Sequence, residues 1–306
     1  MIRDAQKQDK ADIYELWKHT YPNKAQSYLQ FYFQYLFDQG TCVVCEQDHR
    51  IIASIHMEKQ VIAFSGKKLE ASYLLGVATF VDYRRRGHMR ELMQSVLDEA
   101  SHNHLITFIE AFNPKLYEPF GFEVVYYHKH YYIQRKHLDH IPSVNGVSHS
   151  FTAQDLLDTY EAFTKHFDGY CVRNIAYYEN FMRKGLLENR NICVYRDENH
   201  LVKGYAYYSK KDKECKIHEI IYVESIGLMK MLKYICGNHE EIHLELSQAE
   251  SLEKVVPMAI PKKQPFLMAR IHDLDIFNKL YNTDVKTTKE AFQMIRKPLY
   301  NNERFE

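Results

Sequence analysis

The chain has 306 residues, of which 45% are hydrophobic, and its 40 basic side chains balance 40 acidic ones. This length favours two domains, and the hydrophobic fraction is high enough to form folded cores, which excludes a globally disordered chain. A formal charge of zero excludes the broad basic surface that most nucleic-acid-binding proteins carry, so any recognition of phosphate has to be local.

The cysteines and the apolar segments indicate the cellular compartment in which the protein functions. Cys42 and Cys45 have the spacing of a metal or redox pair, but they lie in "TCVVCEQ", which is typical of a β-strand. Residues three apart on a strand point to opposite faces, so we expect buried structural thiols, which suit a reducing cytoplasm. The N-terminal "MIRDAQKQDK" lacks the apolar core of a signal peptide. No apolar run approaches about 18 residues, so we expect a cytoplasmic protein without a membrane span.

The first half of the chain predicts helices, then a meander of strands, then a strand–helix–strand unit. Apolar residues recur at helical spacing in 11–21 and in the aromatic-rich segment 27–37, with Gly40 as the expected end of the second helix. The clearest amphipathic helix follows Gly87. Strand-like runs lie at 41–47, 50–64, 71–81, 105–112 and 123–133. This order predicts an α/β (α+β) fold around a mixed, mostly antiparallel sheet.

A similar order of elements recurs after a segment rich in Pro, Asn, Gly and Ser at 138–150, which is typical of a linker. The expected elements are helices at 153–166 and 174–184, strands at 191–197, 201–210 and 215–223, a helix at 224–236 and a strand at 241–247. The sequence therefore predicts domains at 1–137 and 148–263. The remaining residues, 264–306, are too few for an independent domain and should pack on the others.

The chemistry-bearing stretch is "VDYRRRGHMRELM" at 81–93, where a predicted strand meets the start of the amphipathic helix. The first turn of a helix presents unpaired N–H groups and a positive dipole end, which suit a pyrophosphate. Gly87 permits close approach to the backbone, and Arg84, Arg85 and Arg86 add charged donors. The alternative is a solvated basic turn. Neither a G-x-G-x-x-G nor a G-K-[ST] motif is present, which argues against dinucleotide binding and P-loop hydrolysis.

These residues resemble a known family. Arg84 to Met89 is similar to the R-x-x-G-x-(G/A) acyl-CoA signature of the GCN5-related N-acetyltransferases, and "NPKLYEPFGFE" at 113–123 is similar to a second segment of that family. The two-lobed layout resembles the enhanced-intracellular-survival (Eis) branch, in which a catalytic lobe precedes a degenerate second lobe and a sterol-carrier-like domain. Here 264–306 would be a shortened form of that last domain. Met89 and Val81 depart from the residues that most relatives have.

The resemblance implies two tandem acyl-CoA N-acyltransferase-like lobes, with acetyl-CoA as cosubstrate of the first. Val77 and Thr79 would offer backbone groups to the pantetheine arm, as an added strand does. Asn113 would contact the same arm. The residues implied around the pyrophosphate, largely through main-chain N–H groups, are Arg84, Arg85, Gly87, His88 and Met89.

The resemblance also implies that Tyr117 protonates the departing CoA thiolate. A phenol with a pKa of about 10 is a plausible acid for a thiolate whose conjugate pKa is about 8.5. Phe120 and Phe122 of the same segment are expected in the core. Relatives are thought to use their terminal carboxylate as the base, a role that the sequence does not carry over to Glu306. Glu110 is an alternative base.

The predicted function is transfer of an acetyl group from acetyl-CoA to a primary amine, which by resemblance is an aminoglycoside-like polyamine or a lysine side chain. The alternative is a CoA-binding regulatory protein without transferase activity. We expect neither nucleic acid nor a membrane as a partner. The sequence leaves the oligomeric state open, with a homo-oligomer as one alternative.

Two further clusters have both structural and functional interpretations. His128 and His130 share a strand face, which permits a metal ion, but no third or fourth ligand has recognisable spacing, so no metal is expected. A second cluster, the aromatic stripe Tyr28, Phe31, Tyr32 and Tyr35, either lines an acceptor pocket or packs in the core, and Trp17 has the same two interpretations.

Overall fold

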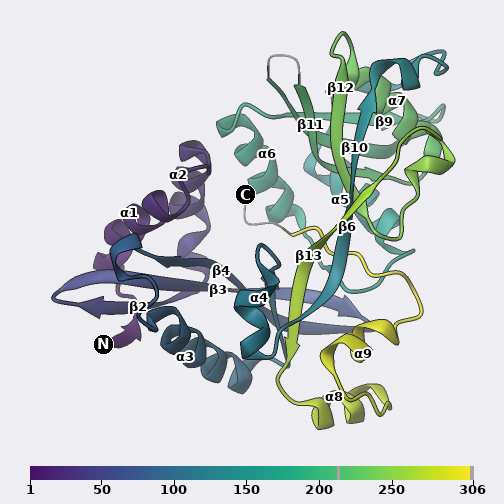
Figure 1. The fold of residues 1–306 in the computed structure, drawn as a ribbon. Helices are drawn as coiled ribbons and strands as arrows, with labels where there is room; N and C mark the ends of the chain where they lie inside the picture. The colour runs from purple at the N-terminus through teal and green to yellow at the C-terminus, as the bar shows by residue number, and fades with distance from the viewer. Residues whose placement is uncertain (212–213, 304–306) are drawn as a thin grey trace. The chain divides into compact units, whose positions relative to one another are not determined.

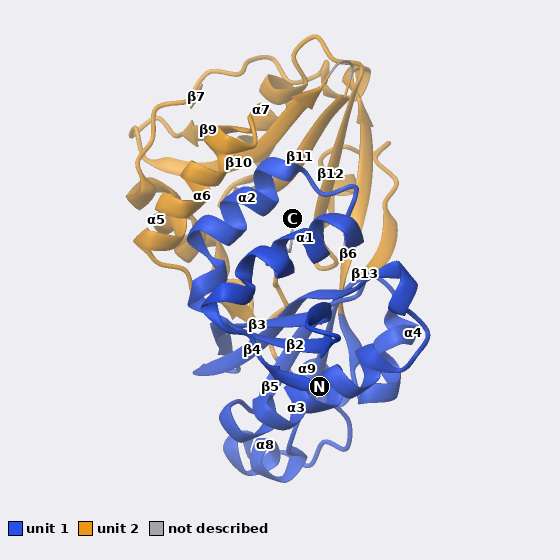
Figure 2. Ribbon diagram, turned by 90° about the vertical axis from the view of Figure 1, so that its left-hand side faces the viewer, with its two compact units in different colours: residues 1–125, 266–295, 303–306 blue, residues 126–265, 296–302 orange. Residues whose placement is uncertain are grey.

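The computed structural model describes residues 1–211 and 214–303, and the chain divides into two compact units (Figures 1 and 2). Unit 1 comprises Met1–Val125 and Phe266–Ile295, with Glu303 as its last described residue. Unit 2 comprises Tyr126–Pro265 and Arg296–Asn302. Across the described residues, no helix is both long enough and apolar enough to span a membrane.

Unit 1 is a mixed sheet with helices on both faces. Its strands lie in the order β1 (Ile2–Asp4), β2 (Thr41–Gln47), β3 (Arg50–Phe64), β4 (Lys67–Thr79), β5 (Ile106–Glu110) and β13 (Lys262–Ile271). Its helices are α1 (Lys10–Thr20), α2 (Gln26–Tyr35), α3 (His88–Asn103), α4 (Pro114–Tyr117), α8 (Leu274–Tyr281) and α9 (Thr288–Gln293). Figure 1 shows α1 and α2 on one side of strands β2–β4 and α3 on the other.

The alternation of β3 explains this arrangement. Ala53, Ile55 and Met57 point to the face that α3 covers, and they form a core cluster with the buried stripe of that helix. The opposite face carries Ser54 and His56, which are fully buried although polar. This second face therefore needs hydrogen-bonding partners from α1 and α2 rather than apolar contact alone.

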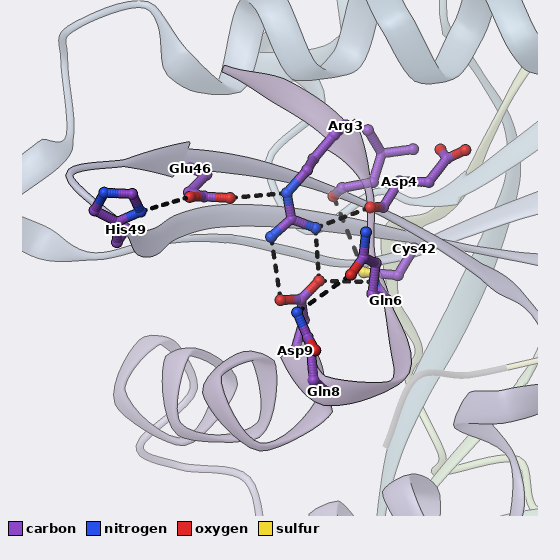
Figure 3. A network of polar contacts seen from close by, with 9 residues as sticks. Arg3, Asp4, Gln6, Gln8, Asp9, Cys42, Glu46 and His49 are labelled. Carbon is purple, nitrogen blue, oxygen red and sulfur yellow. Dashed lines mark hydrogen bonds and ion pairs between the residues drawn. The ribbon is translucent and has the colours of Figure 1, made fainter.

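An arginine at the start of the chain ties β1 to α1 and β2 (Figure 3). Nε of Arg3 donates to Glu46 Oε2 at 2.8 Å, and Nη1 donates to Asp9 Oδ2 at 2.6 Å. The hydrogen bond from Arg3 is the main reason why the pKa of Asp9 is lowered. Because Asp9 also accepts from the Gln6 N–H, this network fixes where α1 begins.

Unit 2 repeats the strand–strand–strand–helix–strand order of unit 1. Its strands lie in the order β6 (Glu123–Gln134), β12 (Glu241–Ser247), β11 (Glu214–Tyr222), β10 (Val202–Lys211), β9 (Asn191–Arg196) and β7 (Val147–Ser148). Its helices are α5 (Ala153–Thr164), α6 (Ile175–Leu187) and α7 (Ser225–Cys236), with the short strand β8 at Tyr170–Cys171. In both units the strand before the helix pairs in parallel with the strand after it. The predicted fold of two related α/β lobes is confirmed.

The unit boundaries differ from those expected at 137/148 and 264. The first crossing falls inside β6, and the predicted linker 138–150 lies wholly in unit 2, where β7 pairs with β9. The described residues of the C-terminal segment, 264–303, belong to units 1 and 2 rather than to a third body, in line with the expectation that they pack on the others. The strand β13 of this segment pairs with β5 from Leu267↔Glu110 to Ile271↔Ile106, because a buried strand needs a ladder that so short a segment cannot build alone.

The cysteines are buried, as the strand-like sequence around Cys42 and Cys45 indicated. All six are free and buried, and Cys42 and Cys45 lie on β2 without a cluster of metal ligands around them in the described residues. The elements that sequence periodicity did not predict are short: β1, α4, β7 and β8. Strands and helices this short contain too few residues to establish a period.

Candidate functional site

The candidate site lies next to a β-bulge in β4. Ser54 pairs with Ala78 and His56 pairs with Leu75, so β4 has one more residue than β3 between these two pairs. Gly76 lies in the bulge with a φ of +60°, and a Cβ there would come within 1.8 Å of Trp17 Cζ2. The indole Nε1 of Trp17 donates to Ser54 Oγ at 2.9 Å. Only glycine fits this position, because both the left-handed backbone and the packed indole exclude a side chain.

Beyond the bulge, β4 separates from β5. The two strands pair in parallel only from Ser72↔Thr107 to Leu74↔Ile109, although β4 continues to Thr79. The N–H of Phe80 donates to Ile52 on β3, so alternation turns the backbone of Thr79 and Val77 toward the β5 side. This is the edge that the predicted added strand would use.

Side chains of unit 1 already occupy the two predicted carbonyls. The Tyr21 hydroxyl donates to the Val77 carbonyl at 2.8 Å, and Arg84 Nε donates to the Thr79 carbonyl at 3.0 Å. A pantetheine arm that bound these carbonyls would have to displace both donors. Arg84 therefore shapes the end of the strand as well as standing at the start of the turn.

The turn between β4 and α3 has the backbone of an anion cradle. After a 3-10 turn at Val81–Tyr83, both Arg85 and Gly87 adopt left-handed conformations, with φ of 61° and 92°. Gly87 is the N-cap of α3 and offers no side chain to the first-turn N–H groups. An added Cβ at Gly87 would meet nothing within 4 Å, so the space in front of the helix is open. Successive N–H groups in such a turn form an anion-binding concavity, which fits a pyrophosphate.

The side chains of the turn divide into outward and inward groups. Arg84, Arg85 and Arg86 are exposed, and the Arg86 guanidinium lies 5.5 Å from the centre of the Tyr83 ring. The His88 side chain points inward, with Nδ1 at 3.9 Å from Cys45 Sγ, and Met89 packs against the core cluster under α3. The residues at 88 and 89 can therefore contribute only their backbone N–H groups to a phosphate, as the resemblance implied.

Tyr117 closes the short helix α4 and is buried, with 8% of its surface exposed. Its ring packs on Phe122 within the α3-side core, and Phe120 also contacts that core, so the expected core positions are confirmed. Burial, with the charge of Glu110 second, raises the pKa of Tyr117 to about 12. Asn113 is the exposed N-cap of α4, and its carbonyl accepts from the Leu116 N–H.

Tyr21 is a residue of this site that sequence reasoning missed. Burial raises its pKa well above the usual value, and Tyr117, Glu110 and Arg84 are the charged or ionisable groups that act on it. Tyr21 therefore lies close enough to interact electrostatically with Tyr117 (the predicted acid), Glu110 (the alternative base) and Arg84, the first arginine of the turn between β4 and α3. Its four-residue spacing from Trp17 was the available signal, since it places both rings on one face of α1.

Beside the bulge, polar side chains form a row on the face of β3 that α1 and α2 cover. This polar row consists of His56, Glu58 and the hydroxyl of Tyr32. The Tyr32 hydroxyl donates to Glu58 Oε1 at 2.6 Å and lies 3.1 Å from His56 Nδ1. Burial lowers the pKa of His56 to about 4, so this imidazole is neutral. Burial also raises the pKa of Glu58 to about 7, and Glu303 adds to the rise, although the hydrogen bond from Tyr32 opposes it.

The aromatic stripe of α2 is mostly core. Tyr28, Phe31 and Tyr32 are each at most 4% exposed, which favours packing over a pocket lining. The Tyr32 hydroxyl reaches His56 and Glu58 of β3. Trp17 is likewise fully buried, and its functional contribution is to hold the bulge at Gly76.

Unit 2 contains a corresponding bulge, but different side chains pack beside it. Tyr207 pairs with Glu219 and Tyr208 pairs with Ile217, which leaves one extra residue on β11. Glu219 receives two hydrogen bonds from Arg173, at 2.7 and 2.9 Å, and one from Tyr205 at 2.8 Å. Burial would raise the pKa of Glu219, but the charge of Arg173 and the hydrogen bonds from Arg173, Tyr205 and Asn302 together lower it. In unit 2 the residue beside the bulge is thus held in a buried ion pair.

Comparisons with known proteins agree with this fold. Residues 1–125 match the family model of an acetyltransferase (GNAT) domain. A probable N-acyltransferase of unknown function from Enterococcus faecalis has a similar structure, with a TM-score of 0.79 and 18% identity over 90% of this chain and 73% of that one. Eis1 from Mycobacterium abscessus has a TM-score of 0.68 and 12% identity over 90% and 75%. A tandem GNAT protein from the clavulanic acid biosynthesis pathway has a TM-score of 0.59 and 10% identity over 89% and 98%. No curated protein matches this chain in sequence.

Residues 1–125 thus belong to the GCN5-related N-acetyltransferase superfamily, the class of acyl-CoA-dependent N-acetyltransferases. Over most of its length, the chain has the fold of the Eis-like tandem GNAT proteins, in which two such lobes follow one another.

Proposed function

We propose that unit 1 transfers an acetyl group from acetyl-CoA to a primary amine. The observation that carries this proposal is the left-handed turn with φ of 61° at Arg85 and 92° at Gly87, which opens at the end of a strand that has separated from its neighbour. In this proposal the residues that hold the pyrophosphate are Arg84, Arg85, Gly87, His88 and Met89. Val77, Thr79 and Asn113 would line the pantetheine arm.

Tyr117 is the proposed donor to the departing sulfur. With a pKa of about 12, it stays protonated throughout the physiological range. A thiol has a pKa of about 8.5, so complete transfer from such a phenol is uphill, and a hydrogen bond to the developing thiolate is the larger contribution. Its burial favours this role because a hydrogen bond to a developing charge is stronger where water is excluded.

Glu58 is the proposed anchor for the acceptor amine. It is a partly buried carboxylate on the α1–α2 face of β3, held by Tyr32, and Glu303 adds a second acidic group to its surroundings. An ammonium group would be stabilised there, since an opposite charge within a few ångströms favours the charged form of both partners. A pKa of about 7 also suits a group that accepts a proton from the amine near neutral pH, directly or through water.

The sequence offered one other carboxylate, Glu110, as an alternative base. Glu110 acts on Tyr117 and raises its pKa, so a negative charge there opposes the developing thiolate rather than helping it. Glu306 lies outside the described residues. We therefore favour Glu58 over Glu110 as the proton acceptor, with both a polyamine and a lysine side chain as acceptors that carry the required charge.

The test is thiol release from acetyl-CoA with a panel of an aminoglycoside, a linear polyamine and a lysine-containing peptide. We expect release with at least one amine and its loss on Tyr117→Phe. Tyr170→Phe, which removes a hydroxyl from a tyrosine of unit 2, is the matched control. Acetyl-CoA binding without release for any amine would support the regulatory alternative, and the absence of binding would contradict both.

A further inference from the structure

Three donor side chains meet on one face of the unit 2 sheet. In the antiparallel pairing of β6 with β12, Glu245 lies directly opposite His130, and His243 lies opposite Tyr132. Residues two apart on a strand share a face, so His130, His243 and Glu245 project to the same side. Their ligand atoms all lie within 4.8 Å of one another.

We propose that His130, His243 and Glu245 bind a divalent transition-metal ion, with Zn²⁺ the best fit. Two imidazoles and one carboxylate are a donor set that Zn²⁺ accepts in proteins. Tetrahedral bonds of about 2.1 Å place neighbouring donors roughly 3.4 Å apart. His130 Nδ1 and Glu245 Oε1 are already 3.6 Å apart. Small side-chain rotations would bring His243 to the same distance.

The surroundings would orient these ligands. His128 is buried, and its Nδ1 lies 3.5 Å from the second carboxylate oxygen of Glu245, so it restrains the direction of that carboxylate. The His243 ring stacks on Tyr132, with 4.6 Å between ring centres and 11° between planes. All of these residues lie on paired strands, which hold ligands more firmly than loops do.

The site would be partly open. The side chain of His130 is 16% exposed, whereas that of Glu245 is 8% exposed. Three protein ligands with solvent on one side leave a position for water or for an outside ligand, as in zinc sites that are not purely structural.

One residue opposes the metal. Lys216 Nζ lies 3.9 Å from Glu245 Oε1, and Lys216 pairs with His243 across β11 and β12. Its positive charge competes with a cation for the same carboxylate, so removing it should strengthen metal binding. The spacing of His128 and His130 in the sequence could not reveal this site, because the other two donors come from a strand more than a hundred residues later.

The proposal is tested by titrating the chelator-stripped full-length chain with Zn²⁺ against a chromophoric competitor. We expect one equivalent to bind, and Glu245→Gln or His243→Ala to weaken this binding by about 100-fold. His140→Ala, at an exposed histidine of the same unit, should leave it unchanged. Lys216→Met should tighten it several-fold. A histidine-rich surface that binds zinc without a defined site would not respond to Lys216.

The visible spectrum of the Co²⁺-loaded chain provides a second readout that does not depend on affinity. Low-coordinate Co²⁺ should give intense bands in the native chain and in His140→Ala, and these bands should disappear in Glu245→Gln. A native circular dichroism spectrum of each variant excludes misfolding as the reason. The proposal is overturned if no zinc binds, or if zinc affinity and the Co²⁺ bands survive Glu245→Gln and His243→Ala.

Discussion

Units 1 and 2 share a bulge but differ in the connection from the bulged hairpin to the next helix. In unit 1, residues 80–87 separate β4 from α3, and their left-handed turn leaves the helix start open. In unit 2, only residues 223–224 separate β11 from α7, and the N-cap is Glu224. The Glu224 side chain is exposed and makes no capping hydrogen bond, so its negative charge would repel a phosphate at this helix start rather than fill the position. The connection is also too short for a cradle.

The interiors behind the two bulges differ as well. Unit 1 has the neutral phenols of Tyr21 and Tyr117 there, whereas unit 2 has Arg173 and Glu219 satisfied by each other. The bulge alone therefore does not make a site. It opens the sheet, and the side chains that fill the opening decide whether a ligand can enter.

The largest expected effect is on catalysis in unit 1. Tyr117→Phe removes the proposed donor to the thiolate and should lower kcat by about 10²- to 10⁴-fold. Affinity for acetyl-CoA should stay within about twofold, because the phenol is not among the proposed phosphate contacts. Steady-state kinetics combined with calorimetric titration separates the two quantities. Equal losses in kcat and in affinity would instead indicate a collapsed pocket.

The second effect concerns stability in unit 2. Arg173→Met leaves Glu219 buried without its partner and should lower the free energy of unfolding by about 3–5 kcal/mol. Adding Glu219→Leu should recover most of the loss, since an apolar pair needs no compensation. Urea denaturation followed by circular dichroism measures both. If Arg173→Met alone costs nothing, the ion pair does not stabilise this lobe.

The third effect is on cofactor affinity. Arg84→Ala combined with Arg85→Gly removes two guanidinium groups, and glycine accepts the left-handed backbone at 85 without strain. Each charge-assisted hydrogen bond contributes about 1.5–3 kcal/mol, so the Kd for acetyl-CoA should rise by roughly 100-fold or more. Lys67→Ala with Lys68→Ala removes the same charge from an exposed hairpin of unit 1 and is the control. Similar changes in Kd in both variants would mean that the arginines act only through long-range electrostatic attraction and do not contact the phosphates.

The smallest effect is on the pH dependence of the acceptor. Glu58 should be ionised above a pKa of about 7 and should then hold an ammonium group. The KM for a cationic acceptor should thus fall by up to about tenfold between pH 6 and pH 8. Glu58→Gln should abolish this change, whereas Glu15→Gln on the exposed side of α1 should retain it. Deprotonation of the amine raises turnover with pH in every variant, so the comparison between variants is the readout.

Periodicity in the sequence predicted the longer elements because they satisfy one period over many residues. The helix after Gly87 and the strand at 241–247 lie where the apolar pattern placed them. The arginine turn was also predictable, since strand, glycine and helix are contiguous there. The boundary between the units could not be predicted, because β13 pairs with β5 through backbone hydrogen bonds that local composition does not reveal.

The proposed acceptor side could be recognised only from the structure. Tyr32 and Glu58 meet because α2 covers one face of β3, and the sequence does not specify the register between a helix and a strand. The bulge at Gly76 can be recognised only from the pairing of β3 with β4. The packing of Trp17 on Gly76 and the hydrogen bond from Tyr21 to Val77 depend on this bulge and could not be predicted either. These are tertiary contacts between segments that periodicity treats separately.

We propose that the chain has one acetyl-CoA site, which lies at the start of α3. Hydrogen–deuterium exchange with and without acetyl-CoA tests it directly, because both helix starts are read in one measurement. We expect slower exchange at the N–H groups of residues 85–90 and no change at residues 223–228. Unchanged exchange at 85–90 in saturating acetyl-CoA, or protection at 223–228, would contradict it.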